Sequence, residues 1–269
     1  MIRHRTLLGT SLLGTALLSA ALLSITVFLI APAAAETIEH RGVSFRIYRF
    51  DPATEDLELH LAGENKPGKF TEVAEKVRSD GKKLKFAMNS GIFEKNFIPT
   101  GLHISNGKTI VPLNREDFVK EQEGQFTPNF YLKPNGVFLF YESGSASIME
   151  TVSFAFTKTA KPDIAVQSGP LLVSQGEIHP ALNKGSESTH YRNGVGVTKS
   201  GDVVFACSAI DPETGLTNLF TFADLFLNQL ECPDALYLDG AISDIFIEGE
   251  TDEIRNRNLF AGIFTITDK

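Results

Sequence analysis

Short apolar runs separated by tight-turn residues are the feature that most constrains the fold. Asn106-Gly107 lies between two such runs, and this dipeptide readily adopts the positive φ angles of a two-residue hairpin turn. Hairpins join neighbouring strands in antiparallel fashion, so the chain is predicted to consist mostly of local antiparallel connections. The predicted hairpins are 102–105 with 108–111, 130–133 with 137–140, 170–174 turning at 175–176, and 194–198 with 203–208.

Two segments carry helical periodicity instead. Apolar residues at positions 70, 73, 74 and 77 predict a helix over 70–78, with Thr71 as its N-cap. A wider apolar stripe predicts a mostly buried helix over 217–230 that ends before Pro233. The strand predicted at 235–238 follows it, a step typical of an α/β unit. The expected fold class is therefore α+β or mixed α/β, a single domain of mostly antiparallel hairpins with two main helices.

The N-terminal segment has the pattern of a secretory signal. Arg3 and Arg5 precede an uncharged run over 6–30, and small residues over 31–35 suit cleavage before Glu36. The run is also long enough to cross a bilayer, so an uncleaved anchor is the alternative and would be the only membrane contact. Either way, we expect 36–269 to be exported, to the periplasm or the medium.

Charge and cysteine content narrow the function classes. The formal net charge is −8, which argues against a nucleic-acid-binding protein because phosphate neutralisation needs an excess of Lys and Arg. Cys207 and Cys232 are the only cysteines. In an exported protein they could form one disulfide, and two buried free thiols are the alternative.

Polar residues interrupt three apolar strands near their ends. Asn89-Ser90-Gly91 follows one strand, Gln167-Ser168-Gly169 a second, and Asp239-Gly240 a third, with Ser243-Asp244 just beyond. Side chains at the ends of buried strands are held by a rigid backbone, and functional sites are often built there. Asn-Gly and Asp-Gly are also ordinary turn formers, so each cluster alone has a structural explanation. Three such ends in one chain favour a site.

A fourth cluster, 190–193, brings positive charge. Arg192 is suited to bidentate recognition of phosphate or carboxylate, and His190 beside it can be protonated. In a chain with net charge −8, an anionic ligand requires such a local concentration of positive charge. A surface arginine paired with an acid is the alternative reading.

Five longer strings contain these clusters or lie near them in sequence: 86–93 (FAMNSGIF), 99–107 (PTGLHISNG), 167–172 (QSGPLL), 192–197 (RNGVGV) and 235–243 (ALYLDGAIS). Taken together, these strings resemble the phosphodiester glycosidase family, and in particular a small bacterial exported subgroup of unknown substrate. The family is named for the uncovering enzyme, an N-acetylglucosamine-1-phosphodiester α-N-acetylglucosaminidase that exposes mannose 6-phosphate. The resemblance covers about 43–263, and its specificity lies in the order of the strings.

The resemblance implies an exported hydrolase that cleaves a sugar–phosphate phosphodiester in a glycan or envelope polymer. Asp239 is the carboxylate expected to stabilise an oxocarbenium-like state or to activate water, and Arg192 is expected to stabilise the leaving phosphate. Asp244 and Glu248 are further carboxylates nearby in sequence. The residues expected to bind substrate are Asn89, Ser90, Gly91, Ser168, Gly169, His190, Asn193, Gly240 and Ser243.

Ala241 stands where better-studied family members have glycine, which could narrow the pocket and bears on sugar specificity. Two other functions remain open. A non-catalytic exported module that binds glycans or sugar phosphates could use the same scaffold. A metal-dependent hydrolase could hold calcium or magnesium through Asp239 and Asp244, with Asn89.

Overall fold

A computed structural model describes residues 1, 35–63, 66–158, 160–250 and 254–269. The chain divides into two units, Met1–Pro32 and Ala33–Lys269, and Met1 is the one described residue of the first unit. The predicted signal or anchor over 1–35 therefore lies outside the described residues, except at its two ends. In the described part of the chain, no helix combines the length and the apolar character needed to cross a bilayer.

The described strands of the second unit form three sheets, and every strand pair is antiparallel. The largest sheet has seven strands and carries most of the candidate site. In spatial order they are β1 (Ala35–His40), β2 (Val43–Phe50), β13 (Val203–Ser208), β12 (Asn193–Val197), β14 (Asp234–Asp239), β10 (Leu171–Ser174) and β11 (Glu177–Ile178).

The two smaller sheets contribute the remaining strands. The four-stranded sheet contains, in order, β15 (Ile245–Ile247), β4 (Leu84–Asn89), β16 (Gly262–Asp268) and β3 (Glu55–Leu61). The five-stranded sheet contains β6 (Lys108–Val111), β5 (His103–Ser105), β9 (Ile164–Ser168), β7 (Gly136–Phe140) and β8 (Ala146–Glu150).

Phenylalanine fills the space in which the three sheets meet. Phe205 of the seven-stranded sheet lies 5.0 Å from Phe86 and 5.4 Å from Phe264 of the four-stranded sheet, measured between ring centroids. Phe138 of the five-stranded sheet lies 6.0 Å from Phe264. Aromatic pairs at such distances gain energy beyond their apolar burial. One central core, rather than any single hairpin, therefore fixes the sheets together.

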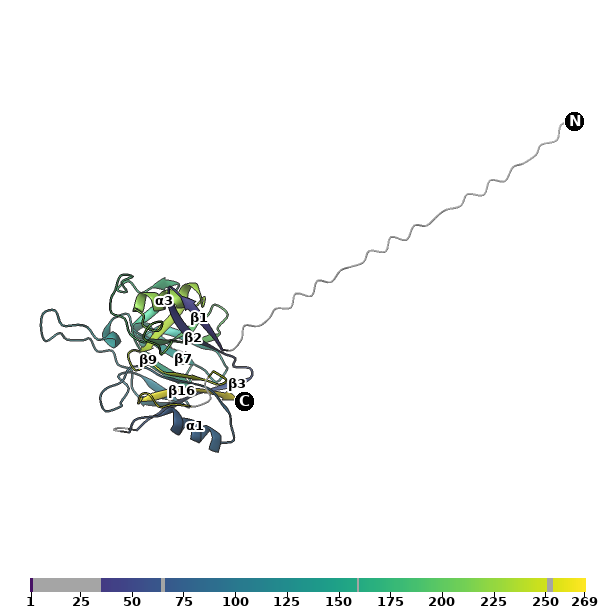
Figure 1. The fold of residues 1–269 in the computed structure, drawn as a ribbon, viewed down its shortest axis with the longest axis horizontal. Coiled ribbons are helices and arrows are strands. Elements are labelled where there is room, and N and C mark those ends of the chain that lie inside the picture. Colours follow the sequence, from purple (N-terminus) through teal and green to yellow (C-terminus); the bar gives the residue numbers. More distant parts are fainter. Residues whose placement is uncertain (2–34, 64–65, 159, 251–253) are drawn as a thin grey trace. The chain divides into compact units, whose positions relative to one another are not determined.

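Helices cover outer faces of this assembly. They are α1 (Phe70–Ser79), α2 (Thr151–Phe156), the short 3-10 helix Asn129–Tyr131, and α3 (Leu219–Asn228). Figure 1 shows α3 beside the strands β1 and β2, and α1 beyond β16 on the opposite side of Ala33–Lys269. A Cβ at position 196 would lie 2.7 Å from both Cys232 Sγ and Phe226, so glycine in β12 lets α3 pack closely on the sheet.

Most predicted elements are confirmed, including both main helices and the hairpins β5–β6, β10–β11 and β12–β13. The fold is richer in β-structure than the mixed α/β prediction. The strand after α3 joins both neighbours antiparallel, so the expected α/β unit is not formed there. The α1 N-cap is Lys69 rather than Thr71. The predicted hairpin of 130–133 with 137–140 is wrong, because Phe130 belongs to a 3-10 helix and β7 pairs with β8 and β9 instead.

Both cysteines are free and buried. Cys207 belongs to the core between the sheets, whereas Cys232 packs under α3 on the other face of the seven-stranded sheet. The disulfide alternative is therefore not the arrangement in this structure.

Candidate functional site

The ends of three strands meet where the four-stranded and seven-stranded sheets come together. Asn89 is the last residue of β4, Asp239 the last of β14, and Asn193 the first of β12. Antiparallel pairing places Asn193 directly opposite Asp239. Asn89 Nδ2 donates to Asp239 Oδ2 over 3.4 Å, although 150 positions separate the two residues. The predicted convergence of Asn89 with Asp239 is therefore present.

Asn193 connects the other two residues. Its Nδ2 donates to the backbone oxygen of Asn89 at 2.8 Å and to Asn89 Oδ1 at 3.0 Å. Its Oδ1 accepts from the backbone N–H of Asp239 at 2.8 Å. Asn193 is fully buried, and its amide holds two strand ends together. Its expected role in binding substrate stays a prediction.

Asp239 has a carboxylate with hydrogen-bond donors but no cation paired to it among the described residues. Oδ1 accepts from the Gly240 backbone N–H at 2.6 Å, and Oδ2 accepts the Asn89 amide. Burial raises the pKa of this carboxyl to about 6, and the two hydrogen bonds oppose that rise only in part. At neutral pH the group is mostly ionised and still close to its titration, as a group in acid–base chemistry needs to be.

Ser243 and Gly240 form the turn after Asp239. Ser243 Oγ donates to the Gly240 oxygen at 2.6 Å, and Ser243 is 1% exposed, so it stabilises the turn. A Cβ at Gly240 would lie 2.5 Å from the Tyr237 hydroxyl and 3.7 Å from Arg192 Nη1. Glycine at 240 thus allows Arg192 and Tyr237 to approach the backbone beside Asp239. Ala241, the next residue, is exposed.

Arg192 is 2% exposed and has no carboxylate within ion-pair distance in the described part of the chain. Nη1 donates to the Tyr237 hydroxyl at 2.8 Å, Nη2 to the Ser188 oxygen at 3.2 Å, and Nε to the Thr217 oxygen at 3.3 Å. Burial raises the pKa of Tyr237 to about 12, so this partner stays neutral. The positive charge of Arg192 is therefore oriented by neutral oxygens and not balanced by a carboxylate.

His190 lies next to Arg192 but is exposed. Its pKa is lowered by desolvation and by the neighbouring Arg192 charge. The sequence indicated that His190 can be protonated, and this lowered pKa makes protonation of the imidazole less favourable.

The remaining predicted residues support the backbone. Ser168 Oγ donates to the Leu238 oxygen at 2.8 Å, which links β9 to β14. Ser90 is 1% exposed, and its Oγ lies 3.4 Å from Nε2 of the buried His103. A Cβ at Gly91 would lie 3.0 Å from the Gln167 oxygen, and one at Gly169 would lie 2.6 Å from Asn135. These four residues pack strands and turns closely together around the site rather than facing an open cavity.

The two further carboxylates have different surroundings: the backbone N–H of Asp244 donates to Asn89 Oδ1 at 3.0 Å, whereas Glu248 pairs with a lysine. Asp244 is 5% exposed; burial raises its pKa, and charges of Arg257 and Arg46 lower it in part. Glu248 forms an ion pair with Lys83 at 2.6 Å. Within the described ranges, no group of three or more His, Cys, Asp or Glu side chains has the arrangement of a metal site.

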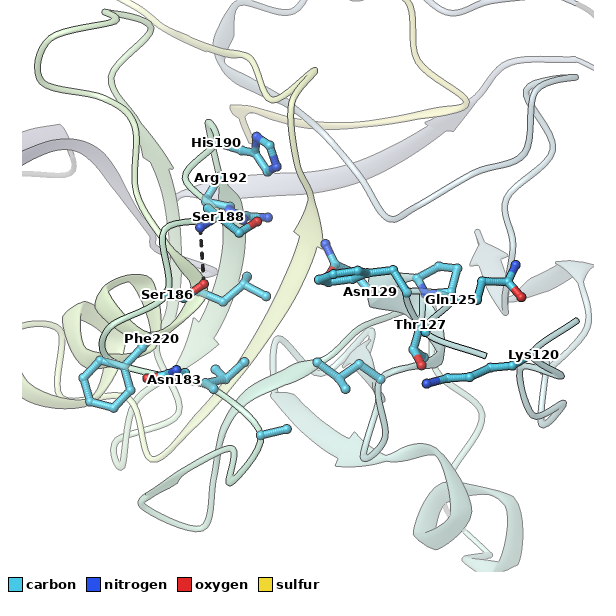
Figure 2. Close-up of a pocket in the computed structure, with 17 residues that line it drawn as sticks. Lys120, Gln125, Thr127, Asn129, Asn183, Ser186, Ser188, His190, Arg192 and Phe220 are labelled. Carbon is cyan, nitrogen blue, oxygen red and sulfur yellow. Dashed lines mark hydrogen bonds between the residues drawn. The ribbon is translucent and has the colours of Figure 1, made fainter. Parts of the chain in front are cut away.

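A cavity of about 700 Å³ opens beside Arg192 (Figure 2). Arg192, His190 and Ser188 line one wall, while Asn129 and Lys120 belong to the other. Asp239 is not among the lining residues of this cavity, whereas Arg192 lines it and also lies close to Gly240, the residue after Asp239. Sequence reasoning missed Tyr237 and Asn129, because one was assigned to the interior of a strand and the other to a hairpin.

Comparisons with known proteins agree with the arrangement of these strands. Uncharacterized protein YigE of Escherichia coli K12 is 30% identical over 249 residues, which is 91% of this chain and 91% of that protein. The catalytic domain of zebrafish N-acetylglucosamine-1-phosphodiester α-N-acetylglucosaminidase, auto-inhibited by its pro-peptide, has a similar fold. It shares 16% identity at a TM-score of 0.58, covering 87% of this chain and 82% of that one.

A hypothetical protein from Synechocystis is also similar, with 14% identity and a TM-score of 0.53, over 87% of this chain and 61% of that one. The model of the phosphodiester glycosidase family matches residues 82–262, a range that contains Asn89, Arg192, Asn193 and Asp239. By this match and by its similarity to YigE, the chain belongs to the phosphodiester glycosidase family.

Proposed function

We propose that this protein hydrolyses the bond between the anomeric carbon of a sugar and a phosphodiester oxygen. The C–O bond breaks and its electron pair leaves with the phosphate. A water then adds to the anomeric carbon and loses its proton, giving a free sugar and a phosphomonoester. The transition state resembles an oxocarbenium ion, so the enzyme must stabilise a developing cation on the sugar and a developing anion on the phosphate.

The observation that carries the proposal is the uncompensated charge of buried Arg192. A guanidinium without a carboxylate is costly to bury, and a bound phosphate would supply the missing counter-charge. Its three neutral partners fix its orientation before ligand arrives. Such preorganised charge is most effective against charge that grows in the transition state.

Asp239 supplies the opposite charge. Gly240, the residue after it, lies against Arg192, so a glycosyl phosphate could present its phosphate to the guanidinium and its anomeric carbon to the carboxylate. Asn89 and the Gly240 N–H fix the orientation of the carboxylate. In the proposed reaction Asp239 stabilises the cation or takes the proton of the attacking water. Phosphate leaves readily, so no acid needs to protonate it.

A direct assay tests this function. Purified protein is incubated with a panel of sugar aryl-phosphodiesters, N-acetylglucosamine included, and with the matching aryl glycosides that lack phosphate, and free sugar is measured. We expect release from a phosphodiester only, with Arg192→Ala strongly impaired and Arg78→Ala, on the remote helix α1, unchanged. Equal cleavage of diester and simple glycoside would contradict the role of phosphate.

The same samples separate the alternatives. A well-folded protein that binds the diesters tightly and releases no sugar would be a binding module. Loss of activity after chelation, restored by calcium or magnesium, would identify a metal-dependent hydrolase.

We also propose that the protein acts outside the cytoplasm, on the basis of the signal-like segment alone. N-terminal sequencing of periplasmic or secreted material should begin at or near Glu36. A protein that retains Met1 and partitions with membranes would instead have an uncleaved anchor.

A further inference from the structure

The cavity beside Arg192 has a charge opposite to that of the whole chain. Its 17 described lining residues include Lys120 and Arg192 but no aspartate or glutamate, whereas the chain carries a net charge of −8. Glu121 and Glu123 follow Lys120 in the sequence without lining the cavity. Inside this cavity, the nearby charged side chains therefore favour anions despite the overall repulsion.

The positive charges of Lys120 and Arg192 lie on different walls of the cavity. Figure 2 shows Lys120 on the side of the loop that leads to Asn129, across the cavity from Arg192 and Ser188. Lys120 is exposed, and in the described part of the chain neither Lys120 nor Arg192 forms an ion pair. Both charges are thus available to a ligand that reaches across the cavity.

The cavity is also larger than a phosphate requires. One water occupies about 30 Å³ in the liquid. The cavity has a volume of about 700 Å³, which leaves room for a group much larger than a phosphate. Its walls include apolar side chains, among them Phe126, which is 89% exposed, and Phe220. Binding sites of this size usually combine apolar walls with a few charged groups that set orientation. The dimensions fit an organic group attached to the phosphate.

We propose that this cavity binds the aglycone, the group on the far side of the phosphodiester from the sugar, and that Lys120 selects an aglycone with a second anionic group. The proposal rests on the proposed function, in which Arg192 holds the scissile phosphate, because Arg192 also lines this cavity. A chain of repeating glycosyl phosphates has this chemistry, since its next phosphate would lie beyond the aglycone.

Two matched substrates test the proposal in the full-length protein. They carry the same sugar, and the aglycone is glycerol in one and glycerol phosphate in the other. The wild type should show a higher kcat/KM for the doubly charged substrate by about two- to fivefold, the range of an exposed charge pair. This preference should fall towards one in Lys120→Met and as salt is raised, because Lys120 is exposed.

Lys108→Met is the matched control, since Lys108 is an exposed lysine on β6 that does not line the cavity. It should keep the wild-type preference. A wild-type preference of one or less, an unchanged preference in Lys120→Met, or an equal loss in Lys108→Met would each overturn the proposal.

Binding separates the failure of this proposal from failure of the proposed function. Calorimetric titration compares glycerol bisphosphate with glycerol monophosphate, with no turnover required. A bisphosphate preference that disappears in Lys120→Met supports the subsite even if neither diester is hydrolysed. Equal affinities for the two probes in the wild type would refute it even if both diesters are cleaved.

Discussion

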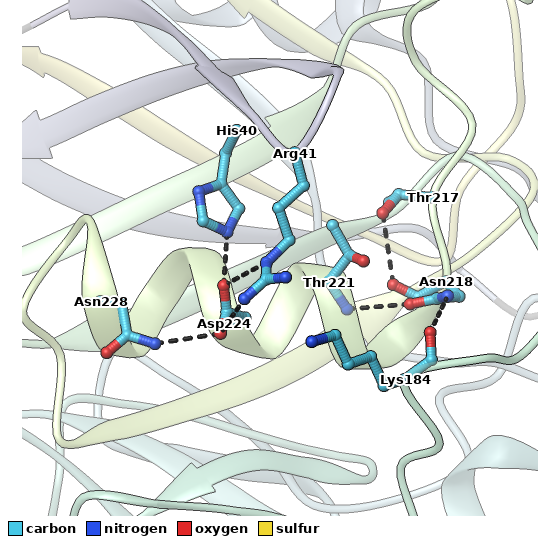
Figure 3. A network of polar contacts seen from close by, with 8 residues as sticks. All are labelled: His40, Arg41, Lys184, Thr217, Asn218, Thr221, Asp224 and Asn228. Carbon is cyan, nitrogen blue, oxygen red and sulfur yellow. Dashed lines mark hydrogen bonds and ion pairs between the residues drawn. The ribbon is translucent and has the colours of Figure 1, made fainter.

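Asp224 and Asp239 are two shielded aspartates with opposite electrostatics. Asp224, 5% exposed on α3, accepts from Arg41 Nε at 2.6 Å, from His40 Nε2 at 2.7 Å and from Asn228 at 3.0 Å (Figure 3). Hydrogen bonding to Arg41 is the main cause that lowers its pKa. Asp239 has only an amide and a backbone N–H, and burial raises its pKa to about 6. The Asp224 carboxylate is balanced by the Arg41 guanidinium, and the Asp239 carboxylate has no cation paired to it in the described part of the chain.

Two arginines, Arg41 and Arg192, show the same contrast between a paired and an unpaired charge. Arg41 pairs with Asp224 and, together with His40, ties the β1–β2 hairpin to α3. Arg192 is more deeply buried and has only neutral acceptors. Balanced charges stabilise the fold, whereas the unbalanced charges of Arg192 and Asp239 lie close to one backbone segment and remain available to a ligand.

The largest expected effect is the loss of kcat/KM when Asp239 is replaced. Asp239→Asn keeps the shape and removes the charge, so kcat/KM should fall by about 10²–10³ or more, the scale for a preorganised electrostatic group. Asp224→Asn is the matched control and should change kcat/KM little. Steady-state kinetics on both variants, with circular dichroism to verify folding, measures the difference. Wild-type turnover in folded Asp239→Asn would remove Asp239 from the mechanism.

The next largest effect is expected when Arg192 is replaced. Arg192→Lys keeps the charge but loses the bidentate fork, so phosphate binding should weaken by about 1–3 kcal/mol. Calorimetry with a sugar phosphate and with the same neutral sugar measures this, and the loss should be smaller for the neutral sugar. Arg78→Lys, on exposed α1 surface, is the control. Equal relative losses for the two ligands would contradict phosphate recognition by Arg192.

The pH dependence should reflect the raised pKa of Asp239. A carboxylate that must be ionised is lost as pH falls through about 6, so kcat/KM should decline about tenfold per pH unit below that value. His190→Gln should keep this profile if Asp239 is responsible. A decline above pH 6 instead would indicate that Asp239 acts as the protonated acid.

The smallest effect is on stability, and its sign should differ between the two aspartates. Asp224→Asn should lower the free energy of unfolding at pH 7 by about 1–3 kcal/mol, because buried His40 loses a charged acceptor. The pKa of Asp224 is lowered on folding, so its stabilisation exists above its ordinary value and is lost as pH falls below it.

Asp239 has a raised pKa in the folded protein, so its ionisation opposes folding as pH rises through about 6. Asp239→Asn should therefore not destabilise the protein at pH 7. Urea unfolding at pH 7 and at pH 4 measures both effects. Equal destabilisation by the two substitutions would remove the distinction between balanced and unbalanced carboxylates.

Local signals in the sequence were sufficient for most elements. The turn at Asn106-Gly107 and the apolar periodicity of α1 and α3 depend on neighbouring residues, and these elements are confirmed. The segment 130–140 misled because Pro134-Asn135-Gly136 resembles a hairpin turn. The strand there pairs instead with β8, which follows it directly, and with the more distant β9. Pairing with β9 depends on tertiary contacts and leaves no local signal.

The sequence by itself determined the strand-rich character of the chain, the strand ends that carry Asn89, Asp239 and Arg192, and, through its ordered blocks, the family. Only the tertiary structure decided the partners and the burial of the polar residues. Asn193 and Ser168 each connect two strands through hydrogen bonds, while buried Arg192 forms no ion pair with a described carboxylate. The residue type determines the chemistry of a side chain, but segments distant in sequence determine how far that side chain is solvated and which groups it contacts. The pKa of a carboxylate and the availability of a guanidinium depend on those partners.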